Sequence, residues 1–213
     1  NWDPYGTIQA NAYGIIAASE SERRRDVFSG HIDLKFNIIK GLTFTSSNGV
    51  DYYNNTSYSF TPQSVNGAGK NSMGNSNLQR MLLQSSNNIT YNHTWNDKHY
   101  LTVTGVWEAT KSTIRNMGIS GSSLQAESVG WWDVKNAVTR DATNGYSDWA
   151  LLSGVGRVIY NYDNRYMLTG TFRADGSSRF TNDKWGYFPS VAVAWTASNE
   201  SFMESTRDLI SNL

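Results

Sequence analysis

Three pairs of strand-like runs, each pair joined across a gap of three residues, constrain the fold of this chain more than any other feature. The gaps are residues 39–41, 97–99 and 163–165. In each pair, apolar residues alternate with polar ones and stay in phase across the gap, as antiparallel hairpins require. The pattern predicts a sheet with one apolar face and one polar face across its width.

The lengths of the runs and of the connections between them indicate a membrane sheet. In residues 26–38 the alternation lasts about twice as long as the roughly 5 or 6 residues of an ordinary strand, which suits a tilted membrane-crossing strand. Between the hairpins we expect long polar loops at residues 57–77 and 112–146, and a shorter one at 176–186. Short turns at one end and long loops at the other are typical of outer-membrane β-barrels.

The expected fold is therefore all-β: an antiparallel, up-and-down segment of a transmembrane β-barrel with about seven strands. The seventh strand is expected over residues 186–196, followed by one short helix near the C-terminus, over about 202–210. Ser201 and Glu204 have the spacing of a capping box at the start of that helix. The turns would be periplasmic and the long loops extracellular.

Composition leaves two other structures open. The chain contains 8 Trp, 12 Tyr and 8 Phe, and lipid-facing barrels use such rings at both membrane interfaces. A soluble β-sandwich carbohydrate-binding module would show a similar aromatic content, and a complete small outer-membrane barrel or adhesin would fit the length. The 18 basic and 18 acidic residues balance, so no net charge favours nucleic acid.

Motifs for catalysis or for metal binding are missing from the sequence. His31, His93 and His99 do not form a metal-binding pattern, and neither a nucleophile elbow nor a phosphate-binding glycine loop occurs. His93 is expected on the lipid-facing side and His99 in a turn. We therefore expect no enzyme activity, no cofactor and no metal site.

The segment over residues 112–149 is the candidate ligand-binding segment. It carries aromatic residues among Ser, Gly and Asn, a mixture that stacks on sugar rings. The candidate ligand-binding residues are Trp131, Trp132, Tyr146 and Trp149. The alternative is that these rings anchor the loop to its neighbours or to the outer membrane interface.

A double motif near the C-terminal end carries a resemblance to a known family. Arg173-Ala174-Asp175-Gly176-Ser177-Ser178-Arg179-Phe180 is followed by Trp185-Gly186-Tyr187-Phe188-Pro189 and by Trp195. This stretch resembles the barrel signature of SusC/RagA-type TonB-dependent outer-membrane transporters. Residues 199–203 resemble the family's turn after that strand, and residues 39–44 resemble an earlier periplasmic turn.

The motif also has a direct physical interpretation. Asp175-Gly176 is a turn signal at the end of a strand. Arg173, Asp175 and Arg179 are expected to form a charge cluster near the rim that holds the adjoining loop on the polar side. The alternative is direct contact with a ligand.

The resemblance implies a function and a set of partners. It implies uptake of glycan oligosaccharides or peptides across the outer membrane of a Gram-negative cell. A SusD-like surface lipoprotein would act as a lid, and the TonB system would supply force through a plug domain. Residues 1–213 are then expected to be one partial barrel domain, in contact with outer-membrane lipid, with the plug domain and the closing strands absent.

Overall fold

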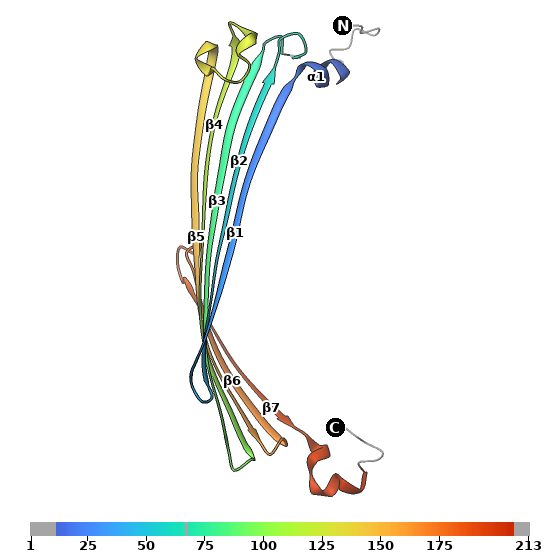
Figure 1. Cartoon of the computed structure of the whole chain (residues 1–213), viewed down its shortest axis with the longest axis vertical. Helices are drawn as coiled ribbons and strands as arrows, with labels where there is room; N and C mark the ends of the chain where they lie inside the picture. Colours follow the sequence, from blue (N-terminus) through green and yellow to red (C-terminus); the bar gives the residue numbers. More distant parts are fainter. Residues whose placement is uncertain (1–11, 67, 207–213) are drawn as a thin grey trace. The chain divides into compact units, whose positions relative to one another are not determined.

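The computed structural model describes residues 12–66 and 68–206, which form one seven-stranded sheet. Its strands are β1 (Glu20–Ile39), β2 (Leu42–Thr61), β3 (Ser72–Trp95), β4 (His99–Leu124), β5 (Ala137–Tyr162), β6 (Tyr166–Ser177) and β7 (Trp185–Trp195). Their order in the sheet follows their order in the chain (Figure 1). The predicted all-β, up-and-down arrangement of seven strands is confirmed. A sandwich needs two sheets, so that alternative is wrong for the described residues.

Among the described residues, helical structure is confined to short segments. They are α1 (Ala12–Ala18) and four 3-10 helices, η1 (Glu127–Val129), η2 (Val134–Asn136), η3 (Ala197–Asn199) and η4 (Ser201–Thr206). The helix predicted over residues 202–210 corresponds to η4 as far as Thr206, and its remainder lies outside the described residues. A helix at the position of α1 was not predicted. Within residues 12–66 and 68–206, no helix is long and apolar enough to cross a membrane.

The turn between β1 and β2 depends on a glycine. Gly41 has a φ of +84°, in the left-handed region that residues with a Cβ rarely adopt. A Cβ on Gly41 would also lie 2.2 Å from the carbonyl oxygen of Asn92 on β3. The hairpin length in the sequence predicted a glycine in the left-handed conformation at position 41. The positive φ and the lack of room for a Cβ both require glycine there.

The other two tight turns use Asn and Asp in place of glycine. Asn96 and Asp97 have φ values of 52° and 50°, and Asp163 and Asn164 have 53° and 54°. These short polar side chains tolerate the left-handed region. The β3–β4 turn therefore begins at Asn96, and His99 is the first residue of β4 and not a turn residue as predicted.

The loops predicted at residues 57–77 and 112–146 are shorter than expected. The connections span residues 62–71 and 125–136, because the flanking polar segments continue as strands. Pairing with a neighbouring strand outweighs the low strand propensity of Ser, Asn and Gly. Asn77 on β3, for example, donates hydrogen bonds to the Asn54 Oδ1 atom and the Thr56 Oγ1 atom of β2, at 2.8 and 2.9 Å. The third connection, 178–184, lies within its predicted range.

The described residues divide into two compact units. The first contains residues 12–29, 51–82 and 112–148, and the second contains 30–50, 83–111 and 149–206. A small hydrophobic core in the first unit consists of Phe60, Met73, Leu124 and Ala137, with Val129, Trp131 and Val134 packed against it. The second unit contains the three tight turns and the double motif.

Strand register in the second unit sorts the side chains onto two faces. Tyr160, Leu168 and Val193 align across β5, β6 and β7, and they belong to what we call the apolar face. The alternate residues, such as Thr171 and its β7 partner Ser190, belong to the polar face. Successive side chains of a strand point to opposite sides, so one face is apolar and the other polar, as the sequence predicted.

Candidate functional site

Arg173, in the first half of the double motif, is the centre of a polar cluster on the polar face. Its Nε atom donates a hydrogen bond to the Asp175 Oδ2 atom at 2.7 Å, and its Nη2 atom donates to the Ser153 Oγ atom at 3.4 Å. The cluster forms because β5 and β6 pair in a register that sets Asp175 opposite Ser153. Arg173 and Asp175 thus meet as predicted from the motif.

A depression of about 410 Å³ extends from Arg173 across the polar face of the second unit. Glu108 on β4 accepts a hydrogen bond at its Oε1 atom from the Ser86 hydroxyl group of β3, at 3.1 Å. His31 on β1 also lines this depression, and its Nε2 atom lies 2.9 Å from the Asp33 Oδ1 atom. The depression therefore contains hydrogen-bond donors and acceptors, and its charged residues include the basic Arg173 and the acidic Glu108.

A second depression, of about 460 Å³, shares Leu151, Ser153 and Arg173 with the first. It adds rings and charges from β6, β7 and the connection between them, namely Asp175, Phe180, Asp183, Lys184 and Phe188. Arg173 therefore lines both depressions. Ion pairs beside aromatic rings suit a polar ligand with hydroxyl, amide or charged groups. The described residues contain no group of three or more His, Cys, Asp or Glu placed to hold a metal ion.

The glycines and rings of the motif form the β6–β7 hairpin. Gly176 pairs with Trp185, Ala174 with Tyr187, Phe172 with Pro189 and Tyr166 with Trp195. The Trp185 ring covers Gly176, where a Cβ would lie 3.0 to 3.1 Å from ring atoms. Similarly, a Cβ on Gly186 would lie 3.0 Å from Phe188. Ser177 ends β6, and its backbone N–H group donates to the Lys184 carbonyl group at 2.9 Å.

Arg179 does not join the expected charge cluster with Arg173 and Asp175. Its guanidinium group lies over the Trp149 ring of β5, 4.9 Å from the ring centroid. A cation over an indole face gains a favourable electrostatic interaction. This contact ties the β6–β7 connection to β5 within the second unit.

The four candidate aromatic residues for ligand binding lie in different surroundings. Trp131 and Trp132 contact each other in the connection between β4 and β5, and both contact Tyr58, at ring centroid distances of 6.0 and 5.6 Å. Trp131 packs against the core of the first unit, whereas Trp132 is 69% exposed. Tyr146 is exposed on β5 in the first unit, and Trp149 belongs to the second unit and contacts Arg179.

A row of aromatic side chains crosses the second unit beside the tight turns. Along it, Trp95 stacks on His93 and on His99, at centroid distances of 5.6 and 5.0 Å. The His99 Nδ1 atom and the Tyr160 hydroxyl group are 2.7 Å apart and share a hydrogen bond. Tyr162 continues the row to Tyr166 on β6. Such a row matches the aromatic girdle at a membrane interface.

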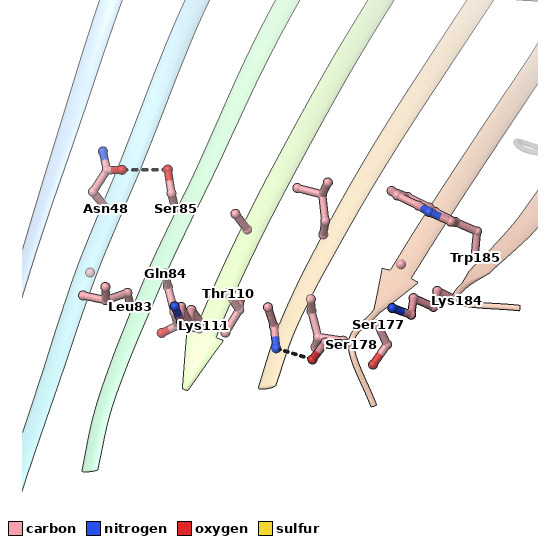
Figure 2. Close-up of a pocket in the computed structure, with 16 residues that line it drawn as sticks. Asn48, Leu83, Gln84, Ser85, Thr110, Lys111, Ser177, Ser178, Lys184 and Trp185 are labelled. Atoms are coloured by element: carbon pink, nitrogen blue, oxygen red, sulfur yellow. Dashed lines mark hydrogen bonds between the residues drawn. The ribbon is translucent and has the colours of Figure 1, made fainter. Parts of the chain in front are cut away.

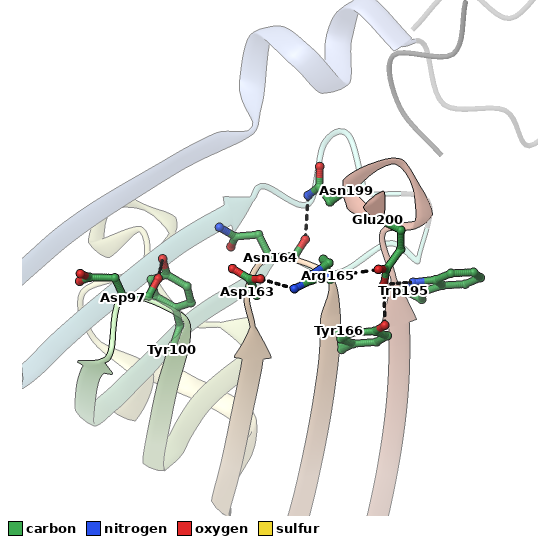
Figure 3. Close-up of polar contacts among 9 residues, drawn as sticks. All are labelled: Asp97, Tyr100, Asp163, Asn164, Arg165, Tyr166, Trp195, Asn199 and Glu200. Atoms are coloured by element: carbon green, nitrogen blue, oxygen red, sulfur yellow. Dashed lines mark hydrogen bonds and ion pairs between the residues drawn. The ribbon is translucent and has the colours of Figure 1, made fainter. Parts of the chain in front are cut away.

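A second polar cluster, around Glu200, joins the β5–β6 turn to the segment after β7 (Figure 3). Glu200 is only 9% exposed and accepts three hydrogen bonds, from the Tyr166 hydroxyl group at 2.5 Å, the Arg165 Nη1 atom at 3.1 Å and the Trp195 indole at 3.2 Å. Arg165 also pairs with Asp163. Sequence reasoning missed this cluster. The signal was the pairing of Tyr166 with Trp195, which brings residues soon after β7 to the turn.

The hydrogen bonds to Glu200 also change its acidity. The pKa of Glu200 is lower than its usual value, first because the Tyr166 hydroxyl group donates to the carboxylate and then because Trp195 and Arg165 do so. The pKa of Arg165 is raised by Asp163 and by Glu200. Glu200 is thus held as a carboxylate at neutral pH, and the cluster links two segments far apart in the sequence.

Comparison with known proteins gives a consistent result. No protein-family model matches the sequence. The chain is 28% identical to the TonB-dependent receptor P3 of Formosa agariphila over 203 residues, covering 93% of this chain and 20% of that receptor. It is 47% identical to the TonB-dependent receptor SusC of Bacteroides thetaiotaomicron over 60 residues, which are 28% of this chain and 6% of SusC. The predicted resemblance to SusC/RagA-type TonB-dependent transporters is therefore confirmed.

The fold of this SusC/RagA-like chain also has a counterpart among solved structures. A structure of the RagAB peptide transporter superposes with a TM-score of 0.72 and 21% sequence identity, covering 87% of this chain and 21% of the matched chain. At this identity, the match shows the fold alone. The SusC/RagA-like chain spans about a fifth of the length of the first curated relatives that it matches.

Proposed function

We propose that this chain forms part of the barrel wall of a TonB-dependent importer in the outer membrane of a Gram-negative cell. Its apolar face meets lipid, and its polar face lines the transport lumen. The observation that carries this proposal is the exposure of large apolar side chains in one row of β7, where Tyr187, Val191 and Val193 are 62%, 76% and 78% exposed. A contiguous apolar surface of this kind is typical of an interface with lipid or with another protein.

The dimensions of β7 support a membrane crossing. Trp185 and Trp195 stand at its two ends on the apolar face. Ten residue steps of about 3.3 Å give roughly 33 Å along the strand. A strand tilt of about 40° reduces this length to roughly 25 Å across the membrane, which equals the height of the apolar band of outer-membrane barrels between their aromatic girdles.

The polar face supports a substrate with hydrogen-bonding or charged groups. Arg173, Asp175 and Glu108, which line the two depressions, would present charges of both signs to the lumen. Glycan oligosaccharides and peptides both have suitable groups. Trp132 and Tyr146 are further candidates for ligand contact, since both are exposed. Trp149 is a third candidate, although it is half-buried and Arg179 lies over its ring.

The proposed partners follow from the resemblance to SusC and RagA. A SusD-like surface lipoprotein would close the extracellular opening, and the TonB system would act through a plug domain. The residues of this chain would contribute wall and lumen lining. Neither catalysis nor a cofactor is part of this proposal.

Uptake by cells that express the full-length protein tests the function. Fluorescent oligosaccharides and peptides are supplied with the TonB system intact or disabled. We expect saturable uptake of one class that disappears without TonB. Uptake of neither class, or uptake that persists without TonB, would contradict the importer proposal.

A pair of arginine variants tests the role of the polar cluster. Arg173→Gln should raise the half-saturating substrate concentration by about 10-fold or more, because a hydrogen bond to a charged group is lost. Arg157→Gln is the matched control, because Arg157 of β5 is on the polar face, as Arg173 of β6 is, and lines neither depression. Equal effects of both variants would remove Arg173 from the binding surface.

A further inference from the structure

The apolar face of the second unit contains a groove of about 660 Å³ (Figure 2). Leu83 of β3, Leu152 of β5 and Trp185 of β7 contribute its large side chains, and Ala109 of β4 and Gly176 of β6 are the small residues between them. Leu83, Leu152 and Trp185 are 42%, 50% and 47% exposed. The lining is therefore mostly apolar and open to its surroundings.

Strand register explains why this groove is hollow. Leu152, Gly176 and Trp185 align across β5, β6 and β7. Gly176 contributes no side chain, and the Trp185 ring lies against its backbone. A larger residue at Gly176 or Ala109 would fill the groove, so its volume depends on small residues at these two positions.

Two hydrogen bonds pair polar groups that line the groove. The Ser85 hydroxyl group donates to the Asn48 Oδ1 atom at 2.7 Å, and the Ser178 hydroxyl group accepts from the Ala150 backbone N–H group at 2.8 Å. These groups satisfy one another. Lys111 and Lys184 also line the groove, and Figure 2 shows them on opposite sides of Ser178.

Neither lysine has an anionic partner within the described part of the chain. All ion pairs found there involve other residues. Lys184 also lines the second depression, which it shares with Asp175 and Asp183, and it forms no ion pair with either of them. Two unpaired cations therefore stand beside an apolar groove.

We propose that this groove binds one acyl chain of a phosphate-bearing membrane lipid, with Lys111 and Lys184 at the phosphate. An acyl chain matches the apolar lining, and a phosphate matches the two free amines. The position agrees with the proposed membrane orientation, on which this inference rests. Trp185 marks the end of the apolar band, and Lys184 is the adjacent residue in the connection beyond it, at the depth expected for lipid headgroups.

Native mass spectrometry of the full-length protein in detergent tests the site. Dioleoylphosphatidic acid is the probe, and dioleoylglycerol, which lacks the phosphate, is its comparison lipid. The Lys111→Gln/Lys184→Gln variant should weaken phosphatidic acid binding by about 10- to 30-fold, since each lysine near a lipid headgroup contributes about a five-fold factor. Its binding of dioleoylglycerol should stay unchanged.

Two further variants separate the groove from general effects of charge. Ala109→Trp fills the groove and should weaken binding of both lipids. Resistance of the variant barrel to heat in detergent checks that the variant folds. Lys35→Gln/Lys98→Gln removes the same charge from the polar face and from the β3–β4 turn, and it should bind as the wild type does. If this control loses as much affinity as the groove variant, or if neither groove variant loses affinity, the lipid site is wrong.

The outcome is distinguishable from failure of the proposed function. If spin labels on the apolar face report lipid while the groove variants bind phosphatidic acid normally, only the lipid site is overturned. If those labels report water, the membrane orientation fails first. Loss of a co-purifying protein from the groove variants, with lipid binding unchanged, would assign the groove to a protein partner and would also overturn the lipid site.

Discussion

An arginine at Val191 should destabilise the barrel far more than an arginine at the next residue. Val191 is on the apolar face of β7, six residues after Trp185 and four before Trp195. At about 3.3 Å per residue and a tilt of about 40°, it lies roughly 15 Å below one ring and roughly 10 Å above the other. It is therefore within a few Å of the middle of an apolar band about 25 Å high.

The expected penalty for Val191→Arg is about 2–4 kcal/mol, the cost of an arginine on the lipid face near the bilayer midplane. Within the described strands the residue opposite Val191 offers this arginine no compensating side chain, because that residue is Gly170. Ala192→Arg is the matched control. Ala192 pairs with Thr169 on the polar face, where an added charge meets the lumen and should cost less than about 1 kcal/mol.

Urea unfolding of the full-length protein in lipid vesicles measures both free energies. The difference between the two variants should exceed about 1 kcal/mol, with Val191→Arg the less stable. Equal destabilisation by the two variants, or a larger effect at Ala192, would refute the assignment of the two faces.

Three other predictions follow from local structure. Gly41→Ala should lower the free energy of unfolding by about 1–3 kcal/mol in the same assay, because Gly41 has a φ of +84° and the added Cβ meets Asn92. Gly170→Ala is the control and should be close to neutral, because a Cβ at Gly170 meets open space. Similar losses of stability in both variants would contradict the turn geometry. Since the pKa of Glu200 is depressed, the stabilising effect of its carboxylate is complete above the usual pKa of about 4.5 and is lost as pH falls through the lower folded-state pKa. Hydrogen exchange at residues 197–203 of the wild type should therefore accelerate as pH falls through this range. The Glu200→Gln variant should lack this pH dependence. A wild type without this acceleration would show that the cluster does not hold the segment. Trp131→Ala should increase proteolysis of the 125–136 connection because Trp131 packs on the core, and exposed Trp132→Ala should not; equal proteolysis would remove the anchoring role of Trp131.

The tight hairpins were predictable because a two-residue period leaves little freedom of register. The third hairpin pairs Tyr160 with Leu168, in phase as the pattern predicted. In the second hairpin the predicted gap at residues 97–99 would set Ile89 opposite Trp107. In the structure Ile89 lies beside Gly105, where a Cβ would be 3.2 Å from the Ile89 side chain. A shift of two residues preserves the faces, so the pattern alone could not detect it.

Other features depend on contacts that no local pattern encodes. Asn77 was expected in the loop over residues 57–77, but it lies on β3 and donates a hydrogen bond to Asn54 of β2. The Glu200 cluster requires three segments, and only the register of β6 and β7 brings them together. The sequence offered two roles for Trp131, and only the packing of its loop shows that it contacts the core.

The central claim is that β7 separates lipid from a lumen, and spin-label accessibility tests it most directly. The chain has no cysteine, so single cysteines at residues 190, 191, 192 and 193 provide unique labelling sites within this segment. In the full-length protein in vesicles, labels at 191 and 193 should be relaxed more strongly by oxygen, which partitions into lipid. Labels at 190 and 192 should be relaxed more strongly by a water-soluble nickel complex. Uniform accessibility, or the reverse alternation, would contradict the two-faced barrel wall.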